Sequence, residues 1–137
     1  MSYAGSSALQ QAVFEELMAH AALNALVGSH VYDAVPSGTI PDLYVSLGPE
    51  DVLDRSDQNG HGARHDFVIS VVSQASGFQE AKDVAAAVCD ALIGAELSLS
   101  RGTLVGLWFL KAKAGRSGTN DNIRRIDLRF RARIDGV

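Results

Sequence analysis

The spacing of apolar residues near the start of the chain predicts a helix from about residue 6 to residue 27. Ser6 or Ser7 can begin it, because a serine side chain there can accept a backbone N–H bond. A break is expected near His20, and Gly28 suits the end of a helix. The apolar residues that recur at helical spacing before and after the break are Leu9, Val13, Leu17, Ala21, Leu23, Leu26 and Val27.

A second helix is predicted over about residues 78–93, and Gly94 ends it. Its buried stripe is made by Ala81, Val84, Ala85, Val88 and Leu92. The opposite side carries the acidic residues Glu80, Asp83 and Asp90.

Strand patterns fill most of the remainder, at about residues 31–34, 43–47, 65–74, 97–100, 104–112 and 123–134. The strand at 65–74 is apolar on both faces, which predicts a central strand that is covered on both sides. Arg101-Gly102 is typical of a hairpin turn between two of the later strands.

The last strand alternates over twelve residues. Its apolar face holds Ile126, Leu128, Phe130, Ala132 and Ile134, and its polar face holds Arg125, Asp127, Arg129, Arg131 and Arg133. The arginines can protect a strand edge from aggregation. They can also meet an acidic surface of a neighbour, such as the stripe of the second helix, or contact nucleic-acid phosphates. The sequence barely separates the first two interpretations.

Two polar, glycine-bearing segments, residues 49–64 and 113–122, have no apolar period and are predicted to be long exposed loops. Loops of this length are usually functional or disordered. The charged and polar residues that could make contacts there are Asp51, Asp54, Arg55, Asp57, His61, Arg64, Lys113, Arg116 and Asn120.

These elements predict an α+β fold in one domain over residues 1–137, with two helices packed on a mainly antiparallel sheet in the order α-β-β-β-α-β-β-β. The net charge of −4 gives no sign that the whole chain binds nucleic acid. The single cysteine, Cys89, excludes an internal disulfide and is consistent with a reducing cytoplasm. The N-terminal residues lack the pattern of a signal peptide, and no apolar run is long enough to span a bilayer.

Candidate catalytic groups are few. His61 and His65 lie four residues apart beside Asp66, but Gly60 and Gly62 argue against the helix that a zinc site of this spacing needs. Ser70, Ser73 and Ser76 lack the context of a nucleophile elbow. Cys89 is expected to be a small buried apolar residue, and no phosphate-binding loop occurs. We therefore expect no enzyme activity, metal or cofactor. A small metal-dependent hydrolase using these histidines or serines is the least favoured alternative.

A family resemblance covers nearly the whole chain, roughly residues 9–134. It is carried by Leu26-Val27-Gly28, by Val31 to Pro36, by Pro41 to Val45, by the strand and Ala-rich helix containing Glu80, Ala81, Ala85 and Val88, and by the closing segment Leu128 to Ala132. In this order and spacing the chain resembles the tail-completion, or tail-terminator, proteins of long-tailed phages and gene transfer agents.

The resemblance implies a structural virion protein that forms a ring of six copies on the finished tail tube. The ring would end tube growth and join the tube to the head or neck, and double-stranded DNA would pass through its lumen without sequence-specific binding. The implied partners are further copies of the chain, the major tail tube protein and the head-completion or stopper protein, with no membrane. The implied location is the tail or neck of the particle, and the host cytoplasm during assembly. Another neck component, a stopper or adaptor, is the alternative within the structural class.

Overall fold

The computed structural model describes residues 3–56 and 60–136 of the chain. Its elements are α1 (Ser6–Ala19), α2 (Ala21–Val27), β1 (Val31–Tyr32), β2 (Leu43–Asp54), β3 (Gly62–Ser73), α3 (Gln79–Leu92), β4 (Thr103–Ser117), the short 3-10 helix η1 (Thr119–Asp121) and β5 (Ile123–Asp135). The five strands form one sheet in the order β1-β2-β3-β5-β4, in which only the short β1–β2 pair is parallel. The α+β prediction is confirmed.

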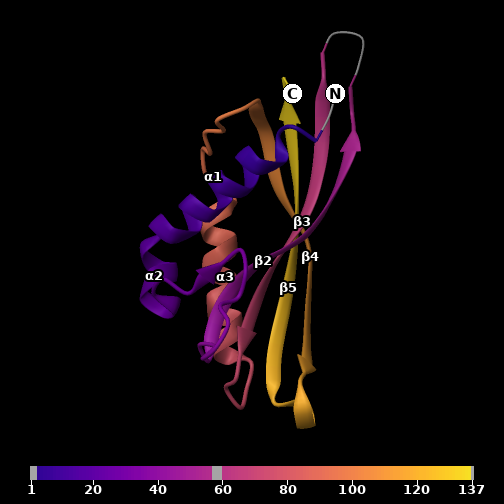
Figure 1. Ribbon diagram of the computed structural model, residues 1–137. Helices are drawn as coiled ribbons and strands as arrows, with labels where there is room; N and C mark the ends of the chain where they lie inside the picture. Colours follow the sequence, from indigo (N-terminus) through magenta and orange to yellow (C-terminus); the bar gives the residue numbers. More distant parts are fainter. Residues whose placement is uncertain (1–2, 57–59, 137) are drawn as a thin grey trace.

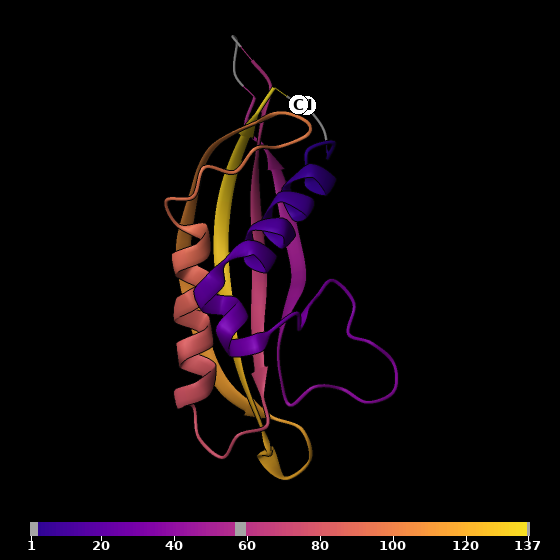
Figure 2. The same ribbon diagram turned by 90° about the vertical axis from the view of Figure 1, so that its left-hand side faces the viewer.

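The helices lie on one face of the sheet and leave the other face bare (Figures 1 and 2). The covered face holds one apolar core, in which Leu17, Val45, Ile69, Val88 and Phe130 are all fully buried. The predicted stripe of α3 is buried as expected. Phe67 and Phe130, which are paired across β3 and β5, stack with their ring centroids 5.7 Å apart. The core therefore lies between the helices and a single sheet face.

The first helical segment is broken where the sequence predicts. His20 has an extended backbone that separates α1 from α2, and α2 ends at Gly28, whose φ of +59° favours glycine. The prediction of a serine cap is wrong, because Gly5 occupies the cap position and no side chain caps the helix. Ser6 instead donates its hydroxyl hydrogen bond to Glu50 of β2.

Both predicted long loops are wrong in their bounds. β2 continues to Asp54 and β3 begins at Gly62, so the connection between them covers residues 55–61. At the other end, β4 continues to Ser117, so only residues 118–122 form the turn before β5. The sheet projects beyond the helices at both ends (Figure 1). The outer strands β2 and β4 bury no side chains there, so backbone pairing holds them without the apolar alternation that marks a strand in sequence.

The predicted strand at residues 97–100 is also wrong. The segment is an irregular connection to β4, and Leu97 and Leu99 are half-buried against the core. The chain crosses here from α3 to β4, and the alternating leucines pack against the core instead of pairing with a strand. The predicted strand at 31–34 shortens to β1, since only Val31 and Tyr32 pair with β2.

The central position of β3 is confirmed, but its predicted cover on both faces is not. Val68 and Val72 lie on the bare face, directly across from Arg129 and Arg125 of β5. Val72 is nevertheless only 5% exposed. Long arginine side chains can cover apolar surface with their methylene groups while the charged end stays in water. The second apolar face of β3 therefore lies under side chains of the sheet itself, with no further layer over it.

Candidate interaction surfaces

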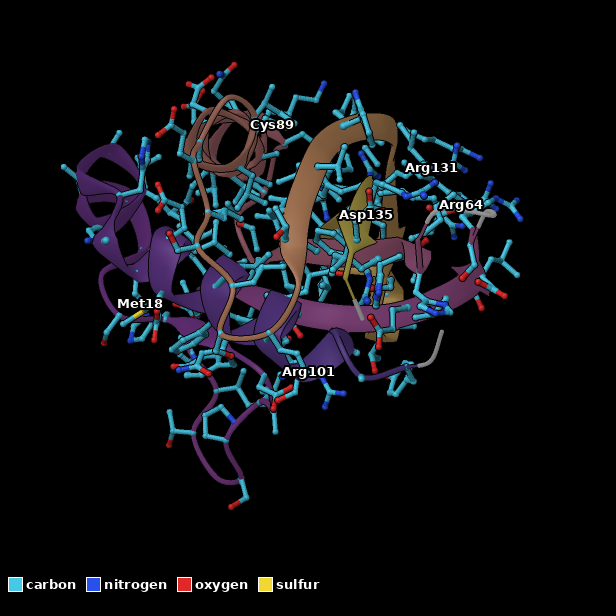
Figure 3. The ribbon with its side chains drawn as sticks, turned by 90° about the horizontal axis from the view of Figure 1, so that it is seen from above. Met18, Arg64, Cys89, Arg101, Arg131 and Asp135 are labelled. Carbon is cyan, nitrogen blue, oxygen red and sulfur yellow. The ribbon has the colours of Figure 1, made fainter. Side chains whose placement is uncertain are left out.

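The bare face of the sheet is basic. The period-two alternation of β5 places Arg125, Asp127, Arg129, Arg131 and Arg133 there, as predicted. The register adds Arg64 and Asp66 from β3, and Trp108, Lys111 and Lys113 from β4. Figure 3 shows Arg64 and Arg131 together on the side of the sheet that faces away from the helices.

Most of these arginines are already paired within the chain. Arg131 donates two hydrogen bonds to Asp66, from Nε at 2.8 Å and from a terminal nitrogen at 3.0 Å. Arg125 bonds to Asp127 at 2.9 Å, and Arg133 bonds to Asp135 at 2.8 Å. The Arg131 bonds are the main reason that the pKa of Asp66 lies below its usual value, with Arg64 and Arg129 adding to the effect.

Arg129 differs from its neighbours. Within residues 3–56 and 60–136 its side chain makes no ion pair or hydrogen bond, and the same holds for Lys111 and Lys113. These three cations line a groove of about 490 Å³ on the bare face, together with Pro49, Val68, Arg125 and Asp127. The sequence predicts Arg129 as a contact residue, but it misses Lys111, because only the register places that lysine beside the arginines.

The acidic residues of α3 lie on the opposite side of the molecule. Glu80, Asp83 and Asp90 are all exposed on the outer surface of the helix layer. Asp83 accepts a hydrogen bond from Gln79 at 3.0 Å. Because the sheet separates them from the basic face, the two sets cannot meet within one subunit. They remain available to other molecules.

The predicted contact residues of the two loops separate into two groups at opposite ends of the sheet (Figure 1). Arg55 and His61 lie in the connection between β2 and β3, with Asp51, Asp54 and Arg64 in the adjoining strands; Asp57 lies outside the described residues. Lys113 and Arg116 lie in β4, and Asn120 lies in the turn at the other end. The turn is held by Arg124, which donates to the carbonyl oxygens of Asp121 and Ser76 at 2.8 and 2.7 Å.

The candidate histidines and serines do not lie in one cluster among the described residues. His61 is exposed, His65 is fully buried on the helix side of β3, and the neighbouring Asp66 lies on the bare face. In the part of the chain that the structure describes, no cluster of three His, Cys, Asp or Glu side chains could hold a metal ion. Ser70 donates to Asp127 at 2.7 Å, and Ser73 accepts from the backbone of Ala75 at 3.0 Å. These serines serve local structure.

His65 faces Glu50 inside the molecule. Its Nδ1 lies 3.7 Å from a Glu50 carboxylate oxygen, too far for a hydrogen bond, and Tyr3 and Ser6 donate to the same carboxylate. Burial lowers the pKa of His65, and Glu50 partly opposes that shift. Cys89 is half-buried on α3, and burial raises the pKa of its thiol, with Asp90 adding to the shift. A raised pKa makes Cys89 a weak nucleophile at neutral pH.

A comparison with protein families assigns most of the chain. The family model described as "Tail completion protein gp17" matches residues 11–135. The chain belongs to this tail-completion family. The resemblance seen in the sequence is thereby confirmed, and the family is one of structural virion proteins.

A solved structure agrees with this assignment. The chain is 63% identical to one chain of a structure titled "Virion of native gene transfer agent (GTA) particle", with a TM-score of 0.93. The alignment covers 98% of this chain and 100% of that chain. A search of curated proteins finds no match. Within the described residues, none of the helices is long and apolar enough to cross a membrane.

Proposed function

We propose that this tail-completion protein is a tail terminator of a gene transfer agent or phage-type particle. Copies of the chain, six in our proposal, form a ring on the end of the tail tube, stop its polymerisation and join it to the head or neck. The observation that carries the proposal is the full-length likeness to a chain of a gene transfer agent virion, together with the family match.

The shape of the subunit supports contacts in two directions. The sheet is long. β2 ends and β3 begins at one end of it, and the turn at residues 118–122 lies at the opposite end (Figure 1). If the strands run along the axis of the ring, one end of the sheet points toward the tail tube and the other toward the neck. Arg55 and His61 are then contact residues at one end, and Asn120 at the other. Asp51, Asp54, Arg64, Lys113 and Arg116 extend these surfaces along the strands.

The separated charges support contacts between subunits. A closed ring joins two different surfaces of the same chain, and the basic sheet face and the acidic side of α3 are one such pair. Arg125, Arg131 and Arg133 are partly satisfied inside the subunit, so Arg129 has the most to gain from Glu80, Asp83 or Asp90 of a neighbour. We propose these residues as part of the assembled interface.

The overall charge is compatible with DNA passing through the ring. The chain carries a net charge of −4, and an acidic surface does not hold phosphates. In our proposal the double-stranded DNA passes through the lumen without sequence-specific binding.

Reconstitution with the tail tube protein tests the proposal. Native mass spectrometry should give the mass of a closed oligomer, and negative-stain images should show it at one end of each tube. Tubes assembled without the protein should be longer and variable in length. A protein that stays monomeric and leaves tube length unchanged would refute the role of terminator. Rings that bind only to portals and never to tubes would instead indicate a stopper or adaptor.

A further inference from the structure

The sheet has two free edges that no other strand covers. Within the described residues β4 pairs only with β5, along its whole length. β2 pairs with β1 only at Val45 and Ser46, so among the described residues no strand pairs with its segment Glu50–Asp54 on the side away from β3. Free edges present unpaired backbone groups and attract other strands unless they are protected or covered.

The edge formed by β4 is apolar in its middle. Four of its side chains are strongly exposed, with relative exposures of 58% for Val105, 49% for Trp108, 45% for Phe109 and 39% for Leu110. The indole of Trp108 lies across Gly106, where an added Cβ would be only 2.4 Å from the ring. An apolar cluster of this kind on an edge strand is typical of a surface that is covered in an assembly.

The same edge is protected against pairing with its own copy. Register shifts between Leu104 and Gly106, and between Phe109 and Lys111, interrupt the regular ladder on either side of the apolar cluster. β4 also carries three cations, Lys111, Lys113 and Arg116, and no acidic residue. Two β4 edges placed together would oppose like charges, so the occupant must be acidic as well as apolar.

The free segment of β2 has that composition. It reads Glu-Asp-Val-Leu-Asp from Glu50 to Asp54, with no cation. Leu53 is 44% exposed. Asp51 makes no ion pair within the described residues. In β2, the apolar residues Val52 and Leu53 are flanked by carboxylates. They therefore complement the apolar cluster of β4 and the lysines that follow it.

The free segments of β2 and β4 also match in their level along the sheet and in their strand direction. The register across the sheet places Glu50, Phe67, Phe130 and Phe109 in one row, and Leu53, Arg64, Arg133 and Gly106 in another. The two free segments therefore lie at the same level. Each of the four long strands is antiparallel to its neighbour, so β2 and β4 run in opposite directions. Copies related by rotation about an axis along the strands would bring these edges together antiparallel and level.

We infer that the subunits join edge to edge: Val105–Leu110 of β4 in one copy packs against Glu50–Asp54 of β2 in the next. The contact uses two different surfaces, as ring closure requires. This inference rests on the proposed ring and specifies how its copies meet. Within the ring, the edges make the contact between copies, and the charged faces of the sheet and α3 lie beside it.

Cysteine cross-linking tests the contact in the full-length protein. In a Cys89→Ser background, Leu53→Cys and Val105→Cys are introduced together, and the assembled protein is oxidised mildly. The expected result is a ladder of disulfide-linked species up to the full ring on a non-reducing gel. Each single cysteine variant should give no species beyond a dimer. The matched control pair, Gln11→Cys with Lys82→Cys, joins two exposed positions of the helix layer and should not form a ladder.

The outcomes separate the inference from the proposed function. A ring by native mass spectrometry without an edge ladder, or with a ladder only in the control pair, would overturn the edge contact and leave the ring intact. A monomer in the presence of tail tubes would overturn both. Reversal of charge gives a second test: Lys111→Glu or Asp51→Lys alone should lose oligomer, and the two together should recover it. Failure of the pair to recover, with both single variants folded, would count against the contact.

Discussion

The two faces of the sheet show what stabilises the subunit and what remains for its neighbours. The face under the helices is filled by apolar side chains, and Ile69, Leu128, Phe130 and Ile134 are at most 2% exposed there. The bare face is filled by charges: Arg131 pairs with Asp66 across β5 and β3, and Arg125 and Arg133 pair with Asp127 and Asp135 within β5. Burial of apolar area is the larger contribution to folding, whereas exposed ion pairs contribute little. Substitutions on the two faces should therefore differ in kind.

The largest expected effect is on the covered face. Phe130→Ala should lower the free energy of unfolding by about 3–5 kcal/mol, because Phe130 is fully buried and its loss leaves a cavity. Val88→Ala removes a smaller buried side chain and should cost about 1–2 kcal/mol. Urea denaturation followed by circular dichroism measures both, and the control is Leu26→Ala, at a side chain that is 42% exposed. A Phe130 variant as stable as the control would show that the covered face is not the core.

A smaller effect is expected on the bare face at Asp66. Asp66→Asn should cost about 0.5–1 kcal/mol at pH 7, since it weakens the two hydrogen bonds from Arg131 at a partly exposed site. The pKa of Asp66 is lowered by folding, so its contribution is present above about pH 4 and is lost as the pH falls below that value. The difference in stability between the parent and the variant should therefore shrink as the pH falls below about 4. A difference that stays constant as the pH falls would show that the effect is not electrostatic.

His65, next to Asp66 in the chain but on the covered face, should make the stability of the protein depend on pH over a different range. Burial lowers the pKa of His65, so below about pH 6.5 the unfolded chain binds a proton more readily than the folded protein does. Stability should fall as the pH decreases from 7 to 5, and His65→Gln should reduce that dependence. The exposed His30, changed to Gln, is the matched control. Equal pH dependence in the parent and the His65 variant would remove His65 as the cause.

The smallest effect on stability is expected at Arg129. Arg129→Glu should change the free energy of unfolding by no more than about 0.5 kcal/mol, because its exposed side chain makes no ion pair or hydrogen bond within the described residues. It should weaken self-association measured by sedimentation velocity, whereas Arg101→Glu in the exposed connection before β4 should not. Arg131→Glu should weaken association too, with an added loss of stability from the broken Asp66 pair. Unchanged association in both variants would remove the basic face from the assembly interface.

The sequence predicted part of the difference between the covered face and the bare face of the sheet. The alternation of β5 assigned Ile126 and Phe130 to one face, and Arg125 and Arg129 to the other, and the structure confirms each assignment. The stripe of α3 was equally clear, because the helical period identifies one face without knowledge of what packs against it. The contact residues could not be grouped in this way. Lys111 joins Arg129 only through the register of β4 with β5.

The amino-acid sequence by itself determined the local elements of the helices and inner strands, the family and the two-sided pattern of β5, because each depends on spacing or order along the chain. Only the tertiary structure decided how far β2 and β4 extend, why Leu97 and Leu99 form no strand, and which edges of the sheet stay open. These features depend on backbone pairing between residues distant in sequence, and such pairing places few demands on side chains where the sheet projects into water.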